Sequence, residues 1–79
     1  MQRFVALLST PIDKSEFETS WNGDAALHGG RKVEFDFTGQ RVSVVVHSDP
    51  STQWASASFH SSFSSVIRRL DRVCNVRWL

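Results

Sequence analysis

The chain contains a single cysteine, Cys74, so an intramolecular disulfide is excluded. Without disulfides, a domain of 79 residues depends on a small hydrophobic core, and its stability is marginal unless the core packs well or the chain oligomerises. The apolar run at residues 4–8 is too short for the core of a secretory signal and for a membrane span. These absences predict a cytoplasmic protein with no membrane segment.

Signatures of catalysis and of metal binding are also missing. No two of the three histidines and Cys74 have the spacing of metal ligands, and no pair of carboxylates lies in an apolar setting that would raise a pKa. The segment 28–32, His-Gly-Gly-Arg-Lys, lacks the longer glycine spacing of phosphate-binding loops, so a plain loop is a simpler interpretation than an anion site. The sequence therefore predicts a protein that is not an enzyme and has no cofactor.

The net charge of +1 is close to neutral, which argues against a strongly electrostatic ligand. The charges are unevenly placed, because acidic side chains outnumber basic ones in residues 1–36 and arginines outnumber acidic side chains in residues 37–79. Such asymmetry can mark two different surfaces on one domain.

Three segments have the patterns of strands. Residues 2–8 form an apolar run that is too short for a helix and ends before Pro11. Residues 32–37 alternate between charged and apolar side chains, and a turn at 38–41 leads to a second strand at 42–47, which predicts an antiparallel hairpin. The side chains expected on the core side of the sheet are Phe4 or Val5, Leu7, Val33, Phe35, Phe37, Val44 and Val46.

Residues 12–22 are compatible with a short helix. Ser15 could cap it, with Glu18 three positions later, and Phe17 and Trp21 would then share one face. The residues from Asp24 to 30 are expected to form a loop containing at most one helical turn.

The clearest pattern in the chain is an amphipathic helix near the C-terminus. Its core-facing stripe has spacings of four, three, four and three and consists of Phe59, Phe63, Val66, Leu70 and Val73. The opposite face carries Ser61, Ser65, Arg68 and Arg72, with Arg69 on its flank.

The start of this helix has two interpretations. Asp49 could cap a helix with Pro50 at its first position, so that the helix runs from about 50 to 73. Alternatively, residues 53–59 form a third strand and the helix begins near Ser61. The Asp-Pro pair favours the long helix. Asn75 then ends it, and residues 76–79 resemble a short terminal strand.

Together these elements predict one α+β domain over residues 1–79, with a small, mainly antiparallel sheet of about four strands and one principal amphipathic helix packed on one face. The predicted partner-binding residues are Ser65, Arg68, Arg69 and Arg72 on the helix, and Trp54, which we expect to be exposed because it does not fit the stripe. Tryptophan and arginine are common at the centres of protein interfaces.

These residues favour a non-enzymatic protein-binding module, such as an inhibitor or adaptor of a larger protein complex. The alternative is a small nucleic-acid-binding module that uses the basic helix face, although the charge of +1 is low for that function. A solvated helix face with no partner is the simplest interpretation of the same arginines. A homodimer could form through the edge strand at 76–79.

In size, compactness and lack of motifs the chain is similar to small phage-encoded inhibitors of bacterial defence, such as anti-CRISPR proteins. The similarity implies a protein that acts by occupying a surface on a larger protein. It includes no sequence motif, so it assigns no functional residue.

Overall fold

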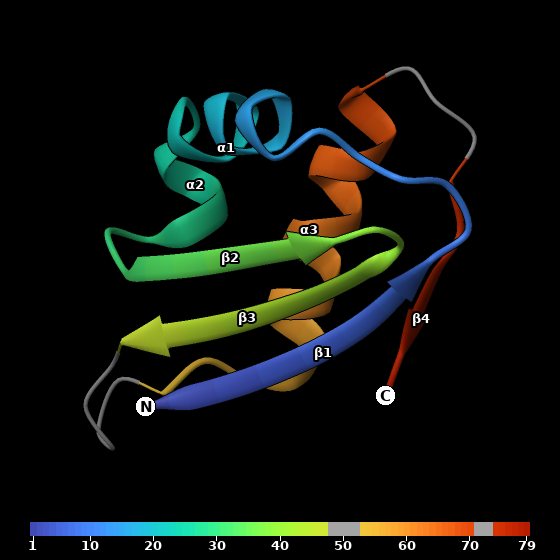
Figure 1. The fold of residues 1–79 in the computed structure, drawn as a ribbon. Helices are drawn as coiled ribbons and strands as arrows, with labels where there is room; N and C mark the ends of the chain where they lie inside the picture. The colour runs from blue at the N-terminus through green and yellow to red at the C-terminus, as the bar shows by residue number, and fades with distance from the viewer. Residues whose placement is uncertain (48–52, 71–73) are drawn as a thin grey trace.

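The computed structural model describes residues 1–47, 53–70 and 74–79. Within these ranges the elements are β1 (Gln2–Leu8), α1 (Lys14–Asn22), α2 (Ala25–His28), β2 (Lys32–Thr38), β3 (Arg41–His47), α3 (Ser56–Arg69) and β4 (Val76–Trp78). The strands form one antiparallel sheet in the order β2-β3-β1-β4. The helices lie on one side of this sheet, and α3 crosses behind it (Figure 1). The predicted α+β fold is confirmed.

The connectivity consists of two interleaved units. β1 and β2 are joined through α1 and α2 and have β3 between them, while β3 and β4 are joined through α3 and have β1 between them. This is the split βαβ arrangement of ferredoxin-like domains. It places β1 and β3 at the centre of the sheet and leaves β2 and β4 as its two edges.

The hairpin of β2 and β3 forms as predicted. The strands pair from Lys32 opposite His47 to Thr38 opposite Arg41, which leaves a two-residue turn. Gly39 has φ of 60° at the first turn position, a positive value that two-residue hairpin turns need there and that glycine adopts without strain. A turn of this type fixes the register of the whole hairpin.

The predicted core face of β1 was wrong in part. Ala6 and Leu8 are buried and Phe4 packs against the core, whereas Leu7 is 38% exposed. An uninterrupted apolar run has no period that identifies its inner face, so pairing with the neighbouring strands decides it. Ala6 lies opposite Val42, whose side chain is buried, and this register turns the even-numbered residues inward.

The helix at residues 12–22 exists, but its cap was predicted wrongly. Asp13, not Ser15, is the N-cap, and its Oδ2 accepts a hydrogen bond of 3.0 Å from the backbone N–H of Glu16. Phe17 and Trp21 face the core, as predicted. The expected single turn in the next loop is α2, which ends at Gly29 with φ of 58°.

Helix α3 begins at Ser56, after an N-cap position occupied by Ala55. Residues 53–55 belong to no helix or strand, so the strand proposed for 53–59 is wrong and the longer helix is wrong over 53–55. Asp49 and Pro50, which were predicted to start the helix, lie outside the described residues. Because alanine has no side-chain acceptor, α3 begins without a side-chain cap at Ala55.

The hydrophobic stripe of α3 supplies the centre of the core. Phe59, Phe63 and Val66 are fully buried, as their spacing predicted, and Ile67 is buried beside them. Leu70 packs against this cluster from its edge, and Val73 lies outside the described residues. Of the helices described, none is long and apolar enough to cross a membrane.

Candidate functional site

Trp54 does not lie on the surface, so the prediction that it is exposed was wrong. Its side chain is only 8% exposed. The indole contacts Trp21 and Phe59, with ring centroids 5.8 and 5.4 Å apart, and the guanidinium of Arg31 lies 4.7 Å from its centre. A tryptophan held in this way stabilises the core and is not available as an exposed anchor for a partner.

The arginine face of α3 is less basic than the sequence suggested. Arg68 and Arg69 are both exposed. Arg69, however, forms an ion pair of 2.9 Å with Asp24, the N-cap residue of α2. The hydrogen bond from Arg69 lowers the pKa of Asp24, and that from the N–H of Ala26 lowers it further. Arg68, the other described arginine of α3, has no ion pair with a carboxylate of the described residues, and it donates to Ser65 Oγ at 3.3 Å. Arg72 lies outside the described residues.

The edge strand β2 presents a different kind of surface, which follows from the hydrogen-bond alternation across the sheet. The N–H of Leu8 donates to the carbonyl of Gln40 at 2.7 Å, so the even-numbered residues of β1 and β3 bond to one another. The odd-numbered residues of β3 therefore bond to β2. On β2 their partners are the even-numbered residues, because Glu34 lies opposite Val45 and Asp36 lies opposite Ser43.

The remaining backbone groups of β2 point away from the sheet. These are the N–H and C=O groups of Val33, Phe35 and Phe37, which we call the β2 edge. No strand of the described chain pairs with them. A strand that ends a sheet with unpaired N–H and C=O groups is a template for pairing with another chain.

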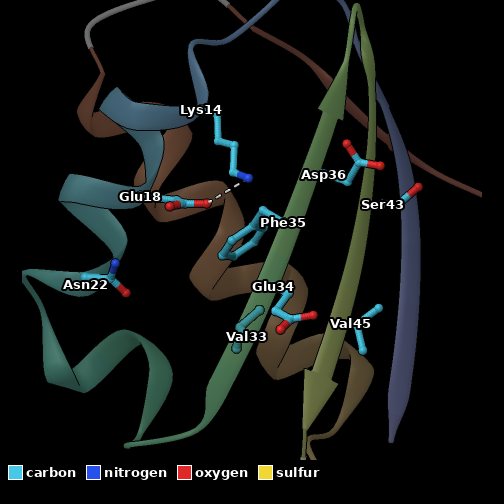
Figure 2. Close-up of a pocket in the computed structure, with 9 residues that line it drawn as sticks. All are labelled: Lys14, Glu18, Asn22, Val33, Glu34, Phe35, Asp36, Ser43 and Val45. Atoms are coloured by element: carbon cyan, nitrogen blue, oxygen red, sulfur yellow. Dashed lines mark ion pairs between the residues drawn. The ribbon is translucent and has the colours of Figure 1, made fainter.

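A groove of about 570 Å³ lies along the β2 edge (Figure 2). One wall is formed by Lys14, Glu18 and Asn22 of α1, and the rest of the lining comes from residues 33–36 of β2 with Ser43 and Val45 of β3. The lining includes side chains from both faces of β2, so the groove follows the strand's free side. Lys14 and Glu18 form an ion pair of 3.7 Å, which leaves the α1 wall without net charge.

The face of the sheet opposite the helices, here called the open face, bears charged, polar and aliphatic side chains. They are Arg3, Val5, Leu7, Lys32, Glu34, Asp36, Thr38, Arg41, Ser43, Val45, His47 and Arg77. None of these is Phe or Trp, whereas ferredoxin-like sheets that bind RNA stack bases on aromatic side chains of this face. The described open face therefore offers no Phe or Trp ring on which a base could stack. Its carboxylates lie on β2 and its arginines on the other strands.

Glu34 has one further contact on this face. Its Oε2 lies 3.3 Å from Nε2 of His47, and the contact is an ion pair only when the imidazole is protonated. The carboxylates of Glu34 and Asp36 are both exposed. The groove at the β2 edge consequently has an acidic side on the open face and a neutral side on α1.

The described residues offer no assembled chemistry beside this groove. No three His, Cys, Asp or Glu side chains within the described ranges lie close enough to hold a metal. Cys74 is half-buried, with its Sγ 3.6 Å from the carbonyl of Thr10. In the 28–32 segment, the N–H of Gly30 donates to Nδ1 of His28 at 3.0 Å, so this group is already used within the loop.

Comparison of the chain with protein-family models, curated proteins and solved structures gives no match. The β2 edge was not among the predicted binding surfaces, although the sequence contains one signal for it. The charged residues at every second position of 32–36 are typical of an exposed edge strand that must avoid uncontrolled pairing.

Proposed function

We propose that the protein is a non-enzymatic protein-binding module, an inhibitor or adaptor of a larger protein, whose partner docks along the β2 edge. The observation that carries this proposal is a free strand of seven residues with a groove beside it. Backbone groups at an edge give affinity to a protein segment without any catalytic residue.

The other candidate surfaces have less support. β4 is also an edge, but it has only three residues and offers few backbone groups. On α3, Arg69 is already paired with Asp24, and a partner would have to compete with that ion pair. The arginine face remains a proposal that the same experiment can compare with the β2 edge.

The experiment is affinity purification from cells of the source organism with the wild type and with Val33→Pro. The N–H of Val33 points away from the sheet, so proline removes an edge donor without removing a bond to β3. Val33→Ala is the matched control, because it loses similar packing but keeps the N–H. We expect Val33→Pro to lose the partner and Val33→Ala to retain it.

A double charge reversal, Arg68→Glu with Arg72→Glu, tests the arginine face in the same experiment. Loss of the partner in this variant, with full retention in Val33→Pro, would move the binding surface from the β2 edge to α3. A partner that all these variants capture equally would contradict both locations.

Nucleic-acid binding is the second candidate, and the exposed Arg3, Arg41 and Arg77 of the open face are the observation in its favour. Against it stand the near-neutral charge and the absence of Phe and Trp from the described open face. Titration of labelled oligonucleotides at two salt concentrations decides the matter, because phosphate contacts weaken steeply with salt. Absence of binding at low salt would remove this candidate.

A further inference from the structure

We infer that the partner segment is an extended strand that pairs antiparallel with β2 and carries lysine or arginine at the positions opposite Glu34 and Asp36. This inference rests on the proposed function, since it names the kind of segment that the β2 edge accepts. Its two supports are the direction of the free backbone groups and the charges beside them.

The backbone geometry selects an extended segment. The free N–H and C=O groups belong to Val33, Phe35 and Phe37, every second residue of one strand. A strand offers its own groups with the same period, whereas a helix uses its N–H and C=O groups internally. Every strand pair already in the sheet is antiparallel, and antiparallel pairing is slightly more stable per residue.

The side chains of the added strand would alternate between two environments. Residues opposite Val33, Phe35 and Phe37 would lie on the helix side, against the wall that contains Asn22 and the Lys14–Glu18 ion pair (Figure 2). This wall has no net charge, and Val33 and Phe35 also line the groove on this side. Uncharged side chains therefore fit there.

Residues in the other set would lie on the open face beside the charges of β2. Across the existing ladder, Glu34 faces Val45 and Asp36 faces Ser43, so neither carboxylate has a cation directly opposite it on β3. An added strand can supply those cations, and opposite charges at directly paired positions stabilise a sheet. Lys32 favours an acidic residue opposite it for the same reason.

The same charges disfavour a second copy of this chain as the occupant. Pairing two β2 edges antiparallel about Phe35, the register that pairs all seven residues, places Glu34 of each copy opposite Asp36 of the other. Like charges directly opposite each other destabilise the pair. In the full-length register, the acidic positions therefore favour a different, basic strand over a second copy.

The probe is a heptapeptide with the complementary pattern, acetyl-Thr-Thr-Lys-Val-Lys-Thr-Glu-amide. Its lysines would lie opposite Asp36 and Glu34, and its glutamate opposite Lys32. Two control peptides are needed. One exchanges every lysine for glutamate and the glutamate for lysine, and the other is N-methylated at the second, fourth and sixth residues, whose N–H groups would face β2.

Binding is measured by NMR on the ¹⁵N-labelled protein at millimolar peptide. We expect shifts and slower hydrogen exchange at the amides of Val33, Phe35 and Phe37. The N-methylated and charge-reversed peptides should bind roughly tenfold more weakly or worse, because they lose ladder hydrogen bonds or gain like-charge contacts. Val33→Pro should lose the matched peptide, while Val33→Ala keeps it.

Several results would overturn the inference. They are no change at the three edge amides with the matched peptide, equal binding of the N-methylated peptide, or equal binding of the charge-reversed peptide. If the matched peptide does not bind while Val33→Pro still abolishes partner capture, the inferred basic strand is wrong and the proposed function stands. If Val33→Pro also captures the partner normally, both are wrong.

Discussion

Gln2 of β1 and Trp54, two residues before α3, are joined by two hydrogen bonds of 2.7 Å. The Nε2 of Gln2 donates to the carbonyl of Trp54, and the N–H of Trp54 donates to Oε1 of Gln2. The side-chain amide of Gln2 thus pairs with both backbone groups of Trp54, as a peptide group of a neighbouring strand would. Because Ala55 gives α3 no side-chain cap, this contact positions the segment that leads into the helix.

Gln2→Ala should lower the free energy of unfolding by about 1–3 kcal/mol, since it removes both bonds and leaves partly buried backbone groups unpaired. Gln40→Ala is the comparison, because Nε2 of Gln40 makes an exposed bond of 3.0 Å to the carbonyl of Ser9. That variant should lose less than about 1 kcal/mol. Urea unfolding of both proteins measures the difference, and equal losses would show that the Gln2 contact has no special role.

Phe63→Asp should prevent folding. Phe63 is fully buried, and its ring centroid lies 4.9 Å from that of Phe17. Removing a buried Phe costs about 3–5 kcal/mol before the cost of a buried charge, which is comparable to the whole stability of about 4–12 kcal/mol for a domain of this size. Arg68→Ala on the opposite face should change stability by less than about 0.5 kcal/mol. Circular dichroism melts test both, and a folded Phe63→Asp protein would contradict the core assignment.

The Asp24–Arg69 ion pair should stabilise the protein only above acidic pH. Because the folded pKa of Asp24 is below its ordinary value of 3.8, the contribution is fully present above that value and is lost as the pH falls through the folded pKa. Asp24→Asn keeps an oxygen that can cap the N–H of Ala26 but removes the charge. Its melting temperature should therefore be lower than that of the wild type near neutral pH and should converge with it in acid. A constant difference across this range would mean that the charge is not responsible.

His60 should make stability fall on mild acidification. Its ring is stacked on that of Trp78 at 4.0 Å, and burial lowers its pKa below the ordinary 6.5. The unfolded chain then binds a proton first, so stability decreases as the pH falls below 6.5 towards the folded pKa. Between about pH 7.5 and 5.5, the melting temperature of the wild type should decrease more than that of His60→Gln. Parallel pH profiles would rule out a contribution from this ring.

The acidic side chains of β2 should keep the protein from pairing with itself. Replacing Glu34 and Asp36 together by threonine removes the like-charge contacts and adds a residue with high strand propensity, so concentration-dependent dimers are expected. Arg3→Thr with Arg41→Thr changes two open-face charges on the central strands β1 and β3 and should remain monomeric. Sedimentation velocity distinguishes the two. Dimers of the wild type that persist in Val33→Pro would instead indicate the predicted self-association through β4.

Local patterns in the sequence predicted the elements whose environment is set nearby. The hairpin follows from alternation at 32–37 with a glycine turn, and the buried side of α3 follows from the spacing of Phe59, Phe63 and Val66. Ile67 was missed because a stripe drawn through single positions is narrower than the face that a helix buries against a sheet.

Features that depend on distant contacts could not be predicted in this way. Trp54 is buried because Trp21, Phe59 and Gln2 converge on it from three different elements. The edge position of β2 is a property of strand order, which no local pattern specifies. For the same reason the sequence directed attention to the arginines of α3 and away from the groove beside β2.

One of the two central strands of the sheet, β1, is the first in the chain, and this order has a kinetic consequence. The β2–β3 hairpin has a two-residue turn and can close within about 10 μs, whereas β1 must find partners as distant in sequence as Val45 and Val76. Until β1 inserts, β3 is itself an unpaired edge, and its valines at 42, 44, 45 and 46 form a hazard for aggregation. A foreign strand on β2 would leave the molecule intact, but one added to β3 during folding would take the place that belongs to β1.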